Sequence, residues 1–216
     1  MSRSLTERCF SLIQTIVFKQ IGAKIPTNSL KRLMDRLFII VEKIGNNFSV
    51  FSSFYLSMYE ELVDQEIAMA RLSSEHRILV IGSGALPATA ILYAQKTHAK
   101  IITIDRDQQT ICQAIRFIQQ FQLGDRLIMV HADGFSYPLD NFDVIVVLYG
   151  VKRQQGILEH IAQHMNKDTQ VIFRTMADTQ GKFLDPQLDI AQYFLIKKHV
   201  RSEALGSFDS FLLQKK

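Results

Sequence analysis

In Arg77-Ile-Leu-Val-Ile-Gly-Ser-Gly-Ala-Leu-Pro-Ala-Thr-Ala90, a short aliphatic run leads into a glycine turn and the beginning of a helix. The run Ile78–Ile81 is typical of a buried strand, and the turn Gly82–Gly84 follows it directly. Glycines in such a turn let the backbone approach a ligand closely, because they carry no Cβ atom. A second apolar strand, Lys100–Ile104, ends in Asp105. The pattern predicts the nucleotide-binding half of an α/β fold.

The same pattern indicates which residues would hold the ligand. Asp105 lies 21 residues after Gly84, where a carboxylate can accept hydrogen bonds from two ribose hydroxyls. Pro87 stands where the dinucleotide fingerprint has its third glycine, which argues against a pyrophosphate ligand. A helix cap is the alternative role for Asp105, although Asp107 is better placed for capping. The expected cofactor-binding residues here are Gly82, Ser83, Gly84, Asp105 and Arg106.

From Arg77 onward, short apolar runs alternate with helical segments, as in a parallel sheet. The expected strands are Arg77–Ile81, Lys100–Ile104, Arg126–His131, Phe142–Leu148 and Thr169–Arg174, and the expected helices are Ala88–Lys96, Gln108–Phe121 and Gln154–Met165. Two further strand-like runs, Gln192–Val200 and Ser207–Lys215, are too close together for a crossover helix, so we expect them to pair antiparallel. A Rossmann-like, mostly parallel sheet with an antiparallel C-terminal hairpin is the layout of class I S-adenosylmethionine-dependent transferases. S-adenosylmethionine is therefore the expected cofactor.

The first 75 residues are expected to form a helical cap, and residues 76–216 the cofactor-binding domain. Apolar residues recur at helical spacing over residues 5–17, 29–44 and 53–73. Glu66 lies on the apolar stripe of the third helix, where an unpaired carboxylate costs several kcal/mol. It forms an ion pair with Arg71, occupies a loosely buried edge position, or belongs to a lid helix that places it over the cofactor site, where it would bind an amine or accept its proton.

Further candidates follow the later strands. Asp133 would reach the adenine amino group, and Phe135, after Gly134, would pack on the ring or in the core. Tyr149 follows the fourth strand at the edge where such sheets bind ligands. Arg174 ends the fifth strand on that edge, where it suits a carboxylate or is simply a surface residue.

Composition narrows the class of protein. The chain has 216 residues, of which 47% are hydrophobic, and a net charge of +4 from scattered Lys and Arg, so we expect a solvated surface and no nucleic-acid partner. Its two cysteines indicate neither a disulfide framework nor a metal cluster, which suits a reducing, cytoplasmic compartment. The N-terminal apolar runs fall short of the roughly 20 residues that span a bilayer, and we expect no signal peptide.

The chain resembles the nicotianamine synthase family, which includes archaeal and bacterial opine-metallophore relatives. Five segments carry the resemblance: Tyr59-Glu-Glu-Leu-Val-Asp-Gln-Glu66, Gly82-Ser-Gly-Ala-Leu-Pro87, Gly150-Val-Lys-Arg-Gln154, Ile157-Leu-Glu-His-Ile-Ala-Gln-His-Met165 and Phe173-Arg174-Thr175. The second is similar to the Gly-Ser-Gly-Pro-Leu-Pro signature of the family.

This resemblance implies transfer of the 3-amino-3-carboxypropyl group of S-adenosylmethionine to the amine of a small molecule or amino acid, with release of methylthioadenosine and a metallophore-like product. By resemblance, Glu66 would hold or deprotonate the amine, with Tyr59 and Tyr149 in the catalytic set, and Arg174 would hold a carboxylate. Two other functions stay open: a small-molecule methyltransferase, and a cofactor-binding module without turnover whose helical cap binds a protein.

Overall fold

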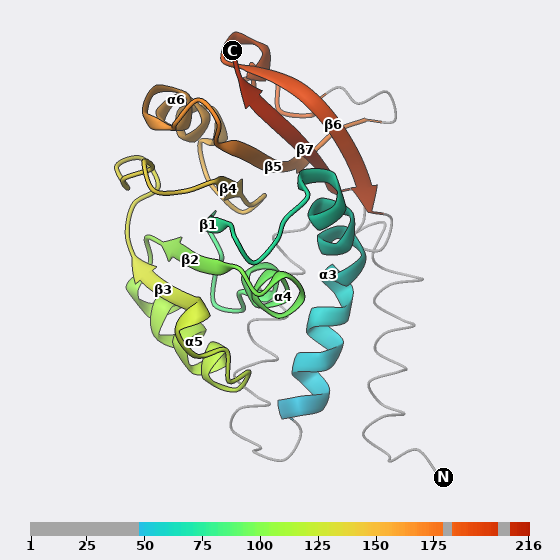
Figure 1. The fold of residues 1–216 in the computed structure, drawn as a ribbon, viewed down its shortest axis with the longest axis vertical. Coiled ribbons are helices and arrows are strands. Elements are labelled where there is room, and N and C mark those ends of the chain that lie inside the picture. Colours follow the sequence, from blue (N-terminus) through green and yellow to red (C-terminus); the bar gives the residue numbers. More distant parts are fainter. Residues whose placement is uncertain (1–47, 179–182, 203–207) are drawn as a thin grey trace.

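A computed structural model describes residues 48–178, 183–202 and 208–216, and Figure 1 shows their arrangement. The elements in chain order are α3 (Phe48–Ala70), β1 (Arg77–Ile81), α4 (Ala88–Thr97), β2 (Lys100–Asp105), α5 (Gln108–Gln119), η2 (Gly124–Arg126), β3 (Leu127–His131), β4 (Val144–Val147), α6 (Gln154–His164), β5 (Gln170–Met176), η3 (Ile190–Gln192), β6 (Phe194–Ser202) and β7 (Phe208–Lys215). The expected helices over residues 5–17 and 29–44 lie outside the described residues.

The strands form one sheet of seven, in the order β3-β2-β1-β4-β5-β7-β6. Five strands, from β3 to β5, run parallel, whereas β7 lies between β5 and β6 and pairs antiparallel with both. The fold class expected from the sequence, a mostly parallel Rossmann-like sheet with a C-terminal hairpin, is confirmed. The hairpin does more than close the edge, because β7 is inserted beside β5.

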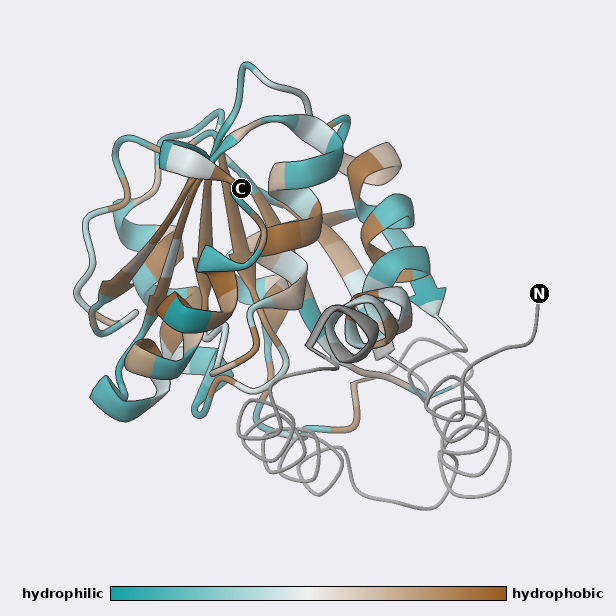
Figure 2. Cartoon of the chain, turned by 90° about the horizontal axis from the view of Figure 1, so that it is seen from below, coloured by the Kyte–Doolittle hydropathy of each residue, from teal (hydrophilic) through white to brown (hydrophobic). Residues whose placement is uncertain are grey.

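Both faces of the central strands are covered, which explains why β4 is apolar along its whole length and β1 is apolar after Arg77. Along β1, Ile78 and Val80 join a core cluster with α3, α4 and α5, whereas Leu79 and Ile81 join the cluster beneath α6. Figure 2 shows hydrophobic strands in the interior of the sheet and hydrophilic residues on the helices around them.

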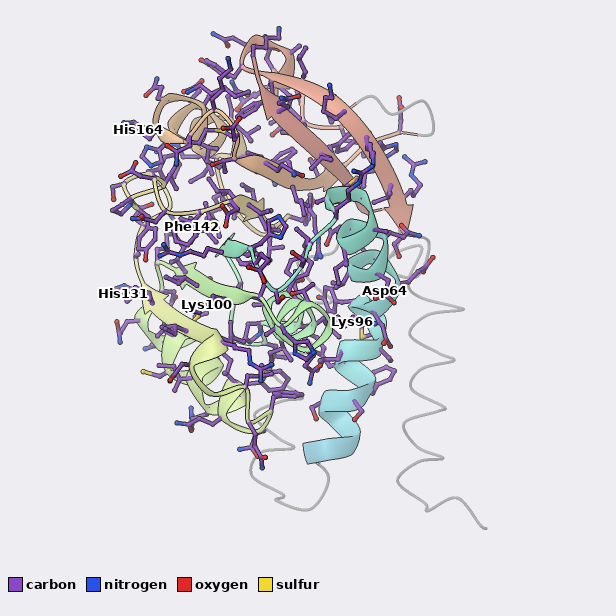
Figure 3. All side chains as sticks on the ribbon, in the orientation of Figure 1. Asp64, Lys96, Lys100, His131, Phe142 and His164 are labelled. Carbon is purple, nitrogen blue, oxygen red and sulfur yellow. The ribbon has the colours of Figure 1, made fainter. Side chains whose placement is uncertain are left out.

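The helix α3 packs on the sheet as part of its core. Leu62 and Val63 are fully buried and belong to the same cluster as Tyr93 of α4 and Ile172 of β5. Lys96 of α4 also bridges to α3, with ion pairs to Glu60 (2.9 Å) and Asp64 (2.7 Å), and Figure 3 shows Asp64 and Lys96 side by side. The domain boundary after residue 75 stays a prediction, and α3 shares its core with the sheet on the other side of that boundary.

Two aspartate side chains bind backbone N–H groups at the beginnings of a helix and a strand. Asp107 caps α5, since its Oδ1 accepts hydrogen bonds from the backbone N–H groups of Gln109 (2.9 Å) and Thr110 (3.0 Å). At the amino ends of the parallel strands, Oδ2 of Asp143 accepts a hydrogen bond from the backbone N–H of Arg77 (2.7 Å) and so holds the beginning of β1 beside β4.

A matched pair of leucine substitutions tests how far α3 belongs to the core. We expect Leu62→Ala to lower the free energy of unfolding by about 2–5 kcal/mol, because it removes a fully buried side chain and leaves a cavity. Leu195→Ala on β6 removes a side chain that is 48% exposed and should cost less than about 0.5 kcal/mol. Urea unfolding measures both values, and equal losses would show that α3 contributes little to the core.

Candidate functional site

A cleft that is open to solvent lies at the carboxyl ends of β1 and β2. It brings together six of the eight expected cofactor residues: Gly82, Asp105, Arg106, Asp133, Gly134 and Phe135. The other walls come from the loop after β4, through Gly150, Val151 and Lys152. The remaining two expected residues, Ser83 and Gly84, are buried parts of the glycine turn and do not line the cleft. The cofactor role of the eight stays a prediction, but most of them meet at one opening.

The turn between β1 and α4 requires glycine at its first position. Gly82 has φ +82°, and a Cβ atom there would lie 2.4 Å from Cγ2 of Val151. Gly84 also has a positive φ, of 69°. Left-handed backbone disfavours residues with a Cβ, and the contact with Val151 adds crowding to that strain. The contact with the loop after β4 is therefore enough to require glycine at this position of the turn.

Asp105 organises the backbone of the turn and remains able to bind a ligand. Its Oδ2 accepts a hydrogen bond from the backbone N–H of Gly84 (3.0 Å), and its Oδ1 accepts one from that of Asp107 (3.1 Å). A carboxylate has about four lone-pair sites, so each oxygen can accept one more donor such as a ribose hydroxyl. Asp107 caps α5, so Asp105 does not serve as the cap, and it lines the cleft.

The segment after β3 is a tight turn beside the same cleft. Oδ1 of Asp133 accepts a hydrogen bond from the backbone N–H of Phe135 (3.0 Å), so this turn occupies one of the two carboxylate oxygens. A Cβ on Gly134 would lie 2.7 Å from Cγ2 of Ile81. The guanidinium of Arg153 lies over the Phe135 ring, 5.1 Å from its centroid. Phe135 is therefore held at the cleft between this turn and the beginning of α6.

Glu66 forms the centre of a second, buried cluster. Its Oε1 accepts hydrogen bonds from Nε of Arg174 (2.7 Å) and Oγ of Ser210 (2.6 Å), and its Oε2 accepts them from Nη2 of Arg174 (2.6 Å) and the hydroxyl of Tyr93 (2.5 Å). Nη1 of Arg174 donates to Oγ1 of Thr89 (2.8 Å). The five residues come from α3, α4, β5 and β7, and none is more than 4% exposed.

The electrostatics of this cluster follow from its burial. Burial alone would lower the pKa of Arg174, but the charge of Glu66 and its hydrogen bonds raise that pKa above the ordinary value. Burial, and then the charge of Glu66, raise the pKa of Tyr93 well above its usual range, so the phenol stays protonated. Removing one partner of a buried ion pair costs about 3–5 kcal/mol, because the other charge is left uncompensated.

The structure gives Glu66 a different ion-pair partner from the one expected. The partner of Glu66 is Arg174, and Arg71 is exposed just beyond the end of α3. Arg174 is 4% exposed, so it is no surface arginine. Glu66 lies against the middle of α4, where Tyr93 binds it, and is not among the residues that line the cleft. Its catalytic role stays a prediction.

The other two expected catalytic residues lie near this cluster. Tyr59 lies two helical turns before Glu66 on α3, and its hydroxyl is 3.3 Å from that of Tyr55. The Tyr55 hydroxyl also donates to the backbone oxygen of Leu86 (3.4 Å), which connects α3 to the loop after the glycine turn. Tyr149 is half-buried on the loop after β4 and packs against the hydrophobic core cluster that contains Leu62 and Tyr93.

Three residues of the cluster were not found from the sequence. Thr89 and Tyr93 are four residues apart on α4, and so lie on one face of the helix, immediately after the glycine signature. Ser210 is a polar residue on the inward face of β7, next to the buried Leu212 on that face. A buried carboxylate predicts such donors in general, but the sequence does not say which residues reach it.

Taken together, the sheet order and the cleft define a class I S-adenosylmethionine-dependent transferase fold. The chain belongs to the nicotianamine synthase family, since the family model described as nicotianamine synthase protein matches residues 28–215. The family expected from the sequence is thus confirmed.

Curated relatives match part of the chain. An L-histidine 2-aminobutanoyltransferase of Yersinia pestis is 26% identical over 121 residues, which are 56% of this chain and 45% of that protein. One of the same name from Pseudomonas aeruginosa is 26% identical over 140 residues, covering 61% of this chain and 51% of that protein. The aligned part of the chain thus spans about half the length of these relatives.

Solved structures share the fold. A glutamate-to-glutamine mutant of MtNAS in complex with S-adenosylmethionine has a TM-score of 0.73 at 20% identity, covering 99% of this chain and 80% of that one. An RNA methyltransferase from Salinibacter ruber in complex with S-adenosyl-L-homocysteine has a TM-score of 0.59 at 15% identity, covering 72% and 91%. Within the described residues, no helix is both long and apolar enough to cross a membrane.

Two glycine substitutions test the contact between the turn and the loop after β4. Gly82→Ala should cost about 1–2 kcal/mol for left-handed backbone and about 1–3 kcal/mol more for crowding against Val151. Gly124→Ala is the control, because it has φ +57° but no atom within 4 Å of the added Cβ, so only the backbone cost applies. Chemical unfolding of both variants gives the difference, and identical losses would mean that Val151 moves aside freely.

Proposed function

We propose that this protein transfers the 3-amino-3-carboxypropyl group of S-adenosylmethionine to the amine of a small molecule and releases methylthioadenosine. The observation that carries the proposal is the buried hydrogen bond of 2.5 Å between Glu66 and Tyr93, which lies in the middle of the helix that follows the glycine turn. Membership of the nicotianamine synthase family and the cleft at the carboxyl ends of β1 and β2 support it.

The residues of the cleft suit the nucleoside part of S-adenosylmethionine. Asp105 would accept hydrogen bonds from the ribose hydroxyls, Asp133 would accept one from the adenine amino group, and Phe135 would pack on the ring. When bound, the cofactor supplies a sulfonium with electrophilic neighbouring carbons and leaves as a neutral thioether. Which carbon reacts is then a matter of where the protein holds the nucleophile.

To the second cluster we assign the role of the base that takes up the proton of the amine nucleophile. The Tyr93 oxygen can receive a proton from the amine nitrogen while its own proton passes to Oε2 of Glu66. The C–N bond forms as the C–S bond breaks, and the electron pair of that bond goes to sulfur. Arg174 and Ser210 keep the carboxylate in place through their hydrogen bonds to Oε1.

This arrangement refines the expected role of Arg174. The side chain was expected to hold a substrate carboxylate, but two of its nitrogens bind Glu66 and a third binds Thr89. We therefore assign Arg174 to fixing Glu66 in the site. The names of the curated relatives refer to L-histidine, which supports an amino acid as acceptor. A metallophore-like product and a cytoplasmic location stay predictions from the sequence.

The nucleoside product tests the reaction directly. Incubating the protein with S-adenosylmethionine and L-histidine, or other amino acids, should release methylthioadenosine in proportion to a product enlarged by an aminocarboxypropyl group. Chromatography with mass spectrometry identifies both. Release of S-adenosylhomocysteine would instead establish a methyltransferase, and binding of S-adenosylmethionine without either nucleoside would leave a binding module.

Substitutions in the buried cluster test the base. Tyr93→Phe removes the hydroxyl and keeps the ring, so we expect kcat to fall at least about 100-fold, as for loss of a general base, with S-adenosylmethionine binding within about threefold. Glu66→Gln should also abolish turnover and keep binding, but it leaves Arg174 without a buried counter-charge, so its folding must be checked by circular dichroism. Tyr193→Phe, a half-buried tyrosine beside η3, is the control and should retain full activity. An unchanged kcat in Tyr93→Phe would exclude this phenol from the proton path.

A further inference from the structure

Gln154 is a buried amide that connects two parts of the site. It begins α6 directly after Arg153, which has φ +57°, and is 7% exposed. Its Nε2 donates to the backbone oxygen of Arg174 (3.1 Å) and, at 3.5 Å, to that of Tyr149, while its Oε1 accepts a hydrogen bond from Oγ1 of Thr175 (3.4 Å). One side chain thus joins the loop after β4 to the carboxyl end of β5, and burial makes these bonds costly to lose.

The amide takes the place of a missing stretch of strand. β4 and β5 pair up to Val147 and Phe173, after which Leu148 donates its backbone N–H to β1. Arg174, the next residue of β5, therefore has no β4 residue opposite it, and its backbone oxygen accepts its hydrogen bond from Gln154. Buried backbone oxygens need such a partner. The amide therefore holds β5 on the side of β4, at the point where the ladder between these two strands ends.

Each end of this connection belongs to one half of the site. The loop after β4 lines the cofactor cleft through Val151, which also contacts Gly82. At the other end, the Arg174 guanidinium holds the carboxylate of Glu66. We propose that Gln154 is a positioning residue that sets the place of the Glu66–Arg174 pair relative to the cofactor cleft. The proposal rests on the proposed function for its catalytic consequence, because a displacement of about 1 Å at a reacting group can cost a factor of about 100.

The first test observes the position of Arg174 without any turnover. In proton–nitrogen spectra of the full chain, the Nε–H of Arg174 should exchange slowly with solvent, because it is buried and bonded to Glu66. In Gln154→Glu, which keeps the size of the side chain but sets a carboxylate against two backbone oxygens, this exchange should become at least about tenfold faster. The Nε–H of Arg201, bonded to Asp209 at 2.9 Å, is the internal reference and should not change.

The neighbouring glutamine provides a matched control. Gln155→Glu makes the same chemical change in the same turn of α6, but the Gln155 side chain binds Glu159 (3.2 Å) and the backbone of Asp189 (2.9 Å), away from the site. With S-adenosylmethionine and the acceptor, Gln154→Glu should lower kcat about 10- to 100-fold while the Kd for S-adenosylmethionine stays within about threefold. Gln155→Glu should keep both values.

The outcomes separate this proposal from the proposed function. An Arg174 signal and a kcat that are unchanged in folded Gln154→Glu, or equal effects in Gln155→Glu, overturn the positioning role. Should Gln154→Glu not fold, Gln154→Asn gives the same test, because the shorter amide cannot reach the backbone oxygens of both Tyr149 and Arg174. If the wild-type protein releases no methylthioadenosine, the proposed function fails, and the Arg174 exchange measurement still decides whether Gln154 holds this residue.

Discussion

The buried ion pair between Glu66 and Arg174 is the interaction on which the arrangement of this protein depends. A charge removed from water is tolerated only when its partners are complete, and this carboxylate accepts four hydrogen bonds from three other elements. Because those donors lie on α4, β5 and β7, the pair fixes how α3 lies on the sheet. The same requirement that makes the cluster costly to disturb keeps the Tyr93 hydroxyl aimed at the carboxylate.

Much of the fold was predictable because its strands carry a local signal. β1 and β2 are mostly apolar, and both were predicted to within one residue at each end. β4 is shorter than expected, at Val144–Val147, although the backbone of Asp143 and Leu148 still bonds to neighbouring strands. Such limits depend on neighbouring strands, and a single segment does not contain that information.

The site was predictable in its cleft and only in part in its buried cluster. The glycine turn and Asp105 follow from chain-local spacing, and the structure brings them to one opening. The partners of Glu66 are separated from it by 27, 108 and 144 residues, and no spacing rule connects them. The position of Glu66 on the apolar stripe of α3 indicated that its carboxylate has hydrogen-bond partners. Naming Tyr93 and Ser210 required the packing of α4 and β7 around α3.

The insertion of β7 between β5 and β6 has a consequence for how the protein is made. Ser210 reaches Glu66 only after β7 has entered the sheet, so a growing chain that has folded through β5 still holds an incompletely paired carboxylate. Contacts of such sequence separation form late, because the entropy of closing a long loop must be met first. The buried cluster around Glu66 is therefore completed by the same event that completes the sheet.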